Sequence, residues 1–459
     1  MQNDNRFLGT EPIGKLLFRL ALPSVAAQLI NMLYNIVDRI YIGHMSGDGD
    51  LALTGVGICL PLIMLISAFA YLISAGGAPR ASIAMGQGNR ALSEKIMGCC
   101  FALQIVVSLG LTTVLLLWNR PLLLAFGGSE NTIDYAVAYM NIYAVGTFFV
   151  QVTLGMNAYI TAQGFAKTSM YTVLIGAVCN LILDPIFIFG LDMGVRGAAL
   201  ATVISQGISC CWVLSFLQGK KTVWRVRKEN LWLDWKLLRP CLALGLSPFI
   251  MQASESVVFV CFNASLLQYG GDVAVGAMTI LTSVMQFALL PLQGLGQGAQ
   301  PITSYNYGAQ NSQRVKVAVF LLLKVSVVYA VVLWVLILLF PEIFAGMFTP
   351  DPALLAFASR VLPIYCGAMV IFGIQTACQL TFVAIGYAKS SILVAVVRKF
   401  VLLLPLIYLM PWLMEDQTMA VYAAEPVADV LAVSFTVILF TVQFRKALRT
   451  MKTPEKGSA

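Results

Sequence analysis

The sequence NLILDPIFIF, residues 180–189, places an aspartate and a proline inside an apolar run. A carboxylate in the middle of a membrane-length hydrophobic segment costs about 2.5–3.5 kcal/mol on insertion scales. Such residues usually face a protein or water-filled interior and act on ions, protons or substrates. Pro185 removes a backbone hydrogen bond and bends the helix where the charge of Asp184 sits. The stretch therefore predicts a membrane helix that carries a functional site.

The composition of the whole chain is that of a multi-pass membrane protein. Of 459 residues, 59% are hydrophobic and only 11% are charged, against about 25% charged in a soluble domain. One membrane helix needs roughly 20 apolar residues. We therefore predict an all-α protein with about twelve membrane helices. The apolar runs cover residues 16–42, 51–78, 93–118, 134–158, 168–189, 194–218, 236–269, 273–299, 313–340, 357–382, 390–412 and 419–445.

The basic residues are distributed asymmetrically between the loops. If the N-terminus is cytoplasmic and the helices alternate, most of the 29 Lys and Arg residues fall on the cytoplasmic side. The opposite loops hold only Arg120 and Arg196. This positive-inside pattern predicts that both termini are cytoplasmic. The net charge of +8 is then a topology signal, and we expect no nucleic-acid partner, because the basic runs flank membrane helices.

The chain contains two copies of one half. An offset of 222 residues takes the Leu-Ala-Leu at 20–22 to the Leu-Ala-Leu at 242–244, and the same offset relates Gly86 to Gly308 and Asn89 to Asn311. Each half carries six predicted helices, so both copies have the same orientation, related by an axis along the membrane normal. We predict an N-terminal lobe at 1–218, a cytoplasmic linker at 219–235 and a C-terminal lobe with a short basic tail at 236–459. Duplicated halves favour transport by alternating access.

Polar side chains gather on a few faces of the N-terminal half. The first helix carries Gln28, Asn31, Asn35 and Asp38 at spacings of 3, 4 and 3, which puts them on one face. Asn180 and Asp184 share a face of the fifth helix. Oxygen ligands of this kind suit a small hard cation, and two nearby carboxylates suit a shared proton. An alternative is that the amides only join helices. We predict a cation-coupling site at Asp38, Asn157, Asn180, Asp184 and Thr202, and the same set without Asn157 as ligands if the ion is Na⁺.

The C-terminal half does not copy these groups. The offset takes Asp38 to Val260 and Asp184 to Leu406. This half has its own intramembrane polar groups, and Glu255 among them either binds a cationic substrate, carries a proton, or neutralises Arg398. Together with three groups of the first helix they form the predicted substrate cavity: Gln28, Asn31, Asn35, Gln252, Glu255, Gln375, Gln379 and Arg398.

The sequence also argues against several classes of function. The only histidine is His44, so a histidine-based metal site or proton relay is not expected. There is no Walker A motif, and we expect neither an enzyme nor a bound cofactor besides the coupling ion. A flippase of a lipid-linked or isoprenoid precursor is the alternative to an exporter. A basic cavity at Arg398 and Lys399 would favour it.

These motifs resemble those of the multidrug and toxic compound extrusion (MATE) family. The stretch 180–190 followed by GVRGAALAT at 194–202 is similar to its helix 5–6 signature, and the loops ending in Asn89 and Asn311 resemble its paired cytoplasmic loops. The resemblance is closest to the bacterial DinF and MepA-like branch. It implies a V-shaped, two-lobe antiporter of the cell membrane that exports cationic or amphipathic drugs in exchange for H⁺ or Na⁺, and we expect a monomer. The resemblance implies a cation site in the N-terminal half, at Asp38, Asn180, Asp184 and Thr202 with Asn157 nearby. Glu255 matches an acid of the NorM branch, whose partner acid on helix ten is missing here.

Overall fold

The computed structural model describes residues 6–45, 49–126, 128–349 and 351–451, and every regular element within these ranges is helical. The residues of the predicted basic tail from 452 onward lie outside the described residues. Among the described residues, ten helices are long and apolar enough to cross a membrane, and the bent pair α11 (Pro352–Tyr365) and α12 (Met369–Ala384) adds an eleventh span. Multiple membrane passes and the all-α fold class are therefore confirmed.

The N-terminal half supplies six of these spans after a short first helix. Each begins and ends close to a predicted apolar run, although α3 and α4 extend several residues further. The elements are α1 (Phe7–Thr10), α2 (Ile13–Gly43), α3 (Gly49–Gly86), α4 (Arg90–Ala125), α5 (Ile133–Ala162), α6 (Ala166–Pro185), η1 (Ile186–Gly190) and α7 (Gly194–Gln218).

The C-terminal half begins after residues 219–234, which contain only the short η2 (Lys228–Asn230). This segment coincides with the expected linker. The remaining elements are α8 (Trp235–Gly308), α9 (Ser312–Leu339), α10 (Pro341–Gly346), α11 (Pro352–Tyr365), α12 (Met369–Ala384), α13 (Ala388–Val396), η3 (Val397–Leu403), α14 (Leu404–Leu409), η4 (Met410–Trp412) and α15 (Gln417–Thr450).

The 74-residue α8 is a hairpin of two membrane helices. A straight helix of that length would be about 110 Å long, far more than a bilayer needs. Its direction changes at Gly271, where φ is 65° and ψ is −164°, a region that favours glycine. Thr418 and Tyr422 of α15 donate hydrogen bonds to the carbonyls of Tyr269 and Ala274 on either side of this turn. Counting both arms of α8 gives twelve spans, as predicted.

The internal repeat is visible in the backbone geometry. Gly164 and Gly386, 222 residues apart, have φ of 87° and 82°. Asn89 accepts a hydrogen bond from the backbone of Leu92 at the start of α4, and Asn311 accepts the equivalent bond from Arg314 at the start of α9. The two halves therefore share local structure as well as sequence.

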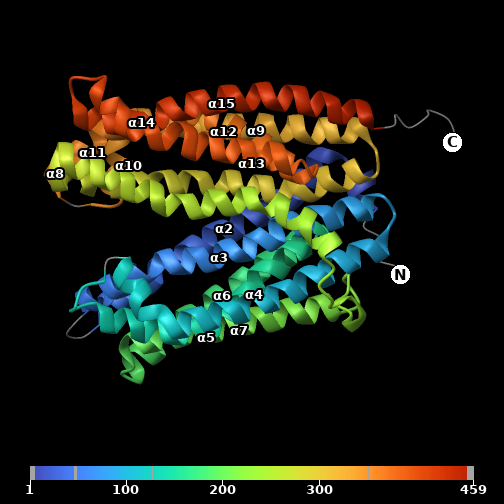
Figure 1. Ribbon diagram of the computed structural model, residues 1–459, viewed down its shortest axis with the longest axis horizontal. Helices are drawn as coiled ribbons and strands as arrows, with labels where there is room; N and C mark the ends of the chain where they lie inside the picture. Colours follow the sequence, from blue (N-terminus) through green and yellow to red (C-terminus); the bar gives the residue numbers. More distant parts are fainter. Residues whose placement is uncertain (1–5, 46–48, 127, 350, 452–459) are drawn as a thin grey trace.

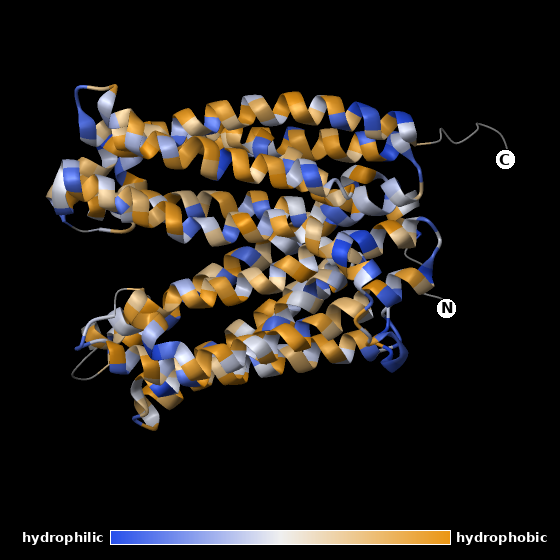
Figure 2. Cartoon of the chain, in the orientation of Figure 1, coloured by the Kyte–Doolittle hydropathy of each residue, from blue (hydrophilic) through white to orange (hydrophobic). Residues whose placement is uncertain are grey.

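The two six-helix bundles form a V. In Figure 1 the N-terminal bundle (blue to green) and the C-terminal bundle (yellow to red) converge at the end that carries the linker and the last turns of α15, and diverge toward the other end. Figure 2 shows that both bundles are apolar along their length, with hydrophilic residues concentrated in the loops at the two ends.

Glycines bring the bundles together at the converging end. A Cβ on Gly86 would collide with the carbonyl oxygen of Tyr305, and a Cβ on Gly308 would collide with that of Ile83. Both pairs obey the 222-residue offset, so the contact is reciprocal. Gly76 and Gly245 make similarly close contacts with the partner bundle's backbone. Small residues thus let α3 and α8 cross at backbone distance.

Candidate functional site

Two carboxylates from different helices meet inside the N-terminal bundle. Asp184 on α6 has no exposed surface, and it lies within electrostatic range of Asp38 on α2. Asn180, one turn before Asp184, donates from Nδ2 to Asp184 Oδ1 at 3.1 Å and is itself buried. The structure therefore places Asp38 and Asp184 near each other, and their action as a pair stays a prediction.

The backbone at Asp184 is irregular for a local reason. Pro185 has no N–H to donate to the preceding turn, so the α-helical pattern stops there. The π-helix η1 follows directly, and the Leu191 amide donates to the carbonyl of Ile186 at 2.9 Å. π-Helical turns inside membrane helices are frequent at functional sites. The charge of Asp184 thus lies at the break between two helix types.

A small cavity adjoins the carboxylate pair. It lies between α2, α5, α6 and α7 and has a volume of about 50 Å³. This space holds a few water molecules or a hydrated ion, but it is far smaller than the 300–1,000 Å³ typical of drug-sized ligands. Its polar lining consists of Asn31, Tyr34, Thr153, Asn157, Thr172, Asn180, Thr202, Ser205, Gln206 and Ser209.

Several buried oxygens at this site have no hydrogen-bond donor among the described residues. They are Asp38 Oδ1, Asn157 Oδ1, Asn180 Oδ1, Asp184 Oδ2 and Ser205 Oγ. Leaving so many acceptors unpaired is costly, because buried polar groups are normally satisfied. Two carboxylates in contact also repel each other unless a proton or a cation lies between them. The donor set of carboxylate, amide and hydroxyl oxygens fits a small hard cation such as Na⁺, and it also fits a shared proton.

The structure brings together all five residues predicted for cation coupling. Asp38, Asn157, Asn180, Asp184 and Thr202 come from four helices and surround or adjoin the one cavity. Their role in coupling stays a prediction.

Three further residues of this site escaped the sequence reasoning. Tyr34 lies within electrostatic range of both carboxylates, Tyr139 lies within electrostatic range of Asp38 and close to Thr202, and Ser205 lines the cavity. Tyr34 could have been found from its four-residue spacing to Asp38, and Ser205 from its three-residue spacing to Thr202. Nothing local in the sequence marks Tyr139.

The polar face of α2, which carries Gln28, Asn31, Asn35 and Asp38, contacts several different partners. Gln28 donates from Nε2 to Gln297 Oε1 on α8 at 3.1 Å and so links the two bundles. Asn31 is exposed and lines the cavity, and Asn35 donates to the Asn31 carbonyl at 2.6 Å. This polar face therefore includes an interlobe bridge besides residues of the ion site.

The C-terminal bundle contains a buried ion network that sequence reasoning found only in part. Arg398 Nε donates to Asp429 Oδ1 at 2.7 Å and Arg398 Nη2 to Glu425 Oε1 at 3.2 Å, with all three side chains under 10% exposed. Its guanidinium also stacks on Phe372 at 4.6 Å. Glu425 and Asp429 were missed, although their four-residue spacing on the last apolar run places them on one helix face.

The alternatives left open for Glu255 are narrowed by its direct partner. Glu255 forms a 2.8 Å ion pair with Lys399, and Arg398 lies within electrostatic range of it. The Glu255 side chain is 55% exposed, whereas that of Lys399 is 4% exposed. Because Arg398 and Lys399 are both paired with acids, they do not form the basic cavity that would favour a flippase.

The predicted substrate-cavity glutamines lie at different depths. Gln252 is partly exposed, whereas Gln375 and Gln379 are buried. Gln379 donates to Ser247 Oγ at 3.1 Å inside the bundle. Both buried glutamines and Arg398 are thus internal, and they do not line an open cavity in this conformation.

Comparison with known proteins identifies relatives over nearly the whole chain. The sequence model of the MatE family matches residues 23–186 and 248–409, one segment in each half. The curated protein "Multidrug export protein MepA" of Staphylococcus haemolyticus is 23% identical over 391 residues, covering 85% of this chain and 86% of that protein. The protein of the same name from Staphylococcus aureus strain N315 is 22% identical over 401 residues, with 87% of each chain covered.

Solved structures share the fold. The "Crystal structure of MATE in the bent conformation" superposes with a TM-score of 0.91 at 21% identity, covering 97% of this chain and 99% of that chain. The "Outward-facing conformation of a multidrug resistance MATE family transporter of the MOP superfamily" gives a TM-score of 0.89 at 20% identity, covering 96% and 98%. The two-bundle arrangement of twelve helices is therefore that of these transporters.

Proposed function

This chain belongs to the MatE family of multi-pass membrane transporters, in its MepA-like branch, and from that premise we propose that it exports small, cationic or amphipathic organic compounds in exchange for H⁺ or Na⁺. Two relatives are named multidrug export proteins, which supports drug efflux as the transport class. We place the protein in the cell membrane as a monomer with both termini cytoplasmic, because the basic loops gather at the end that carries the termini.

The observation that carries the coupling proposal is the proximity of Asp38 to Asp184 beside a cavity that holds a few water molecules. A coupling ion must bind a site that differs in affinity between the two transport conformations. Here the two carboxylates come from α2 and α6, so a shift of one helix past the other would change the affinity for a cation or a proton. The surrounding unpaired oxygens of Asn157, Asn180 and Ser205 would complete the coordination of Na⁺.

The V shape supports alternating access. The bundles converge at the proposed cytoplasmic end through the reciprocal contact of Gly86 and Gly308 and diverge toward the other end (Figure 1). We therefore assign this conformation as outward-facing. The half-exposed Glu255 lies on α8, and we propose that it attracts cationic substrates when Lys399 moves away.

The decisive experiment measures dye efflux from proteoliposomes under an imposed Na⁺ gradient and, separately, under an imposed pH gradient. We expect one of the two gradients to drive transport and the D184N variant to fall to the level of protein-free liposomes. The matched control is D134N, because Asp134 is a largely exposed surface aspartate paired with Arg120, and such pairs contribute little. Efflux by D184N at the wild-type rate, or failure of both gradients, would overturn the antiport proposal.

A further inference from the structure

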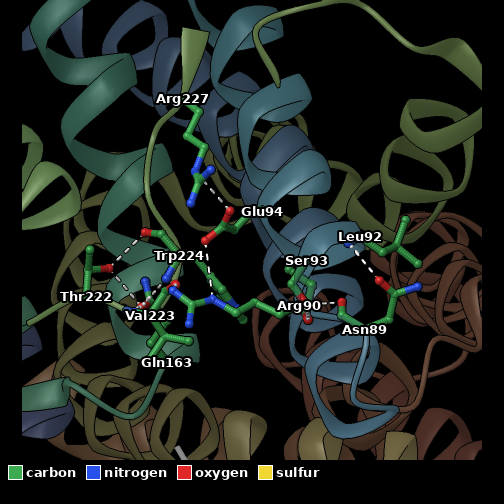
Figure 3. Close-up of polar contacts among 11 residues, drawn as sticks. Asn89, Arg90, Leu92, Ser93, Glu94, Gln163, Thr222, Val223, Trp224 and Arg227 are labelled. Carbon is green, nitrogen blue, oxygen red and sulfur yellow. Dashed lines mark hydrogen bonds and ion pairs between the residues drawn. The ribbon is translucent and has the colours of Figure 1, made fainter. Parts of the chain in front are cut away.

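The linker between the two lobes is folded onto the N-terminal bundle. Gln163 Oε1, at the end of α5, accepts hydrogen bonds from Thr222 Oγ1 at 2.9 Å, Val223 N at 2.8 Å and Trp224 N at 3.1 Å (Figure 3). The Trp224 side chain is completely buried and packs edge-on against Tyr159, with ring centroids 6.3 Å apart. This part of the linker is therefore a fixed part of the bundle.

Ion pairs hold the rest of the linker and neutralise the nearby acids. Glu94 on α4 accepts from Arg90 at 3.4 Å and from Arg227 at 3.3 Å (Figure 3). Lys95 pairs with Asp234 at 2.9 Å, and this hydrogen bond lowers the pKa of the Asp234 carboxyl below its usual value. Glu94 and Asp234 are thus already paired with cations within the protein.

The side chains that the docked linker leaves exposed are mainly apolar or basic. Trp232 is 76% exposed, Trp235 is 55% exposed, and Leu233 between them is also exposed. The same segment carries a group of exposed cations, while Glu229 is the one exposed acid within the fully described residues 219–239. We call this surface the linker patch; its residues are Lys220, Arg225, Lys228, Trp232, Leu233, Trp235, Lys236 and Arg239.

The linker patch lies at the boundary of the membrane. Trp235 is the first residue of α8, whose first arm is a membrane span, so Trp232, Leu233, Trp235 and Lys236 lie beside the start of that span. Tryptophan is enriched at the headgroup level because its ring is amphipathic. Clustered basic residues next to a membrane helix attract anionic headgroups, and Glu229 is the one exposed acid within residues 219–239.

We propose that the linker patch binds the headgroups of anionic phospholipids, with the rings of Trp232 and Trp235 lying among the headgroups and the cations pairing with phosphates. The occupant is a lipid because exposed tryptophans and cations are combined at membrane depth; a soluble anion would leave the two rings in water. Since Gln163 and Glu94 fix the linker to the N-terminal bundle, lipids bound to the linker patch are held against that bundle.

The test uses the purified full-length protein in mixed micelles of equimolar phosphatidylcholine and phosphatidylglycerol. The lipids that co-elute with the protein are quantified by mass spectrometry. We expect phosphatidylglycerol to be enriched several-fold over the bulk ratio for the wild type. The triple variant K220Q/R225Q/K228Q and the variant W232A should each lose at least half of this enrichment. All four substituted side chains are exposed, so the fold is expected to persist, and monodisperse elution checks this.

Matched controls separate a specific patch from general charge. The triple variant R445Q/K446Q/R449Q removes the same charge from the end of α15, and W412A removes a tryptophan that is 83% exposed elsewhere. Both should retain the enrichment. Equal losses in the control and linker variants, or no enrichment in the wild type, would overturn the proposal, and neither result depends on whether the protein transports drugs.

Discussion

At the scale of single residues, charge inside an apolar run marked Asp184, which the structure buries completely. Asp184 was predicted to be a site residue because its insertion cost needs a compensating role, and its neighbours Asn180 and Asp38 followed from helical spacing. The ion pairs of Arg398 and Lys399 in the C-terminal bundle could not be predicted in the same way. Lys399 and Arg398 are adjacent in sequence but project in different directions, so which acid each one meets depends on tertiary packing. Helix spacing alone cannot decide that Glu255 pairs with Lys399.

Arg398 gives a prediction at this scale. Truncation in R398Q leaves Glu425 and Asp429 buried without their cation, and breaking a buried ion network in this way costs about 3–5 kcal/mol. We expect R398Q to lower the apparent melting temperature in detergent markedly and to reduce the yield of monodisperse protein. R360Q, at an exposed arginine, is the control and should behave as the wild type. An unchanged melting temperature for R398Q would show that the network is not structural.

At the scale of elements, apolar runs predicted the helices well and their irregularities poorly. The break between 269 and 273 was predicted and is found at Gly271. The run 357–382 was expected to be one helix, yet α11 and α12 are bent by 54°. Pro363, two residues before the end of α11, and Gly367, between the two helices, are the sequence signs of this bend. The π-helices η1 and η3 were also not expected, because periodicity does not distinguish a π-turn from an α-turn over so few residues.

The linker is attached to the N-terminal bundle through Gln163, and a substitution of Gln163 tests how much this attachment contributes. In Q163A the amide groups of Val223 and Trp224 lose their buried acceptor, and each unsatisfied donor costs about 1–3 kcal/mol. We expect a lower apparent melting temperature and faster amide hydrogen exchange in residues 220–226. Q218A, at an exposed glutamine on the end of α7, is the matched control. Exchange rates in Q163A equal to those of the wild type would mean that the linker is held by its ion pairs and Trp224 alone.

At the scale of the whole molecule, the 222-residue repeat predicted two lobes in the same orientation, and the structure adds how they meet. Glycines at related positions allow backbone contact, and they are found where the lobes converge: Gly86 faces Tyr305, and Gly308 faces Ile83. The sequence repeat shows that Gly86 and Gly308 occupy equivalent positions. It does not show that each glycine contacts the opposite lobe, because an internal repeat does not reveal where the symmetry axis between the lobes lies. The divergence of the lobes toward the other end likewise follows only from three-dimensional packing.

The glycine contact should control the balance between the two transport conformations. A methyl group in G308A would collide with the Ile83 carbonyl, which cannot move aside as a flexible side chain would, so the lobes must separate at this end. We expect G308A to shift the population away from the present conformation. This shift would be measured by electron paramagnetic resonance between spin labels attached to noncanonical amino acids at the exposed positions Gln87 and Gln310. We expect a new component at longer distance in the distance distribution. G110A is the control, because a Cβ at Gly110 meets open space. If G308A and G110A gave the same distance distribution as the wild type, the lobes would have to be held together by other contacts, with Gln28 and its bridge to Gln297 the next to test.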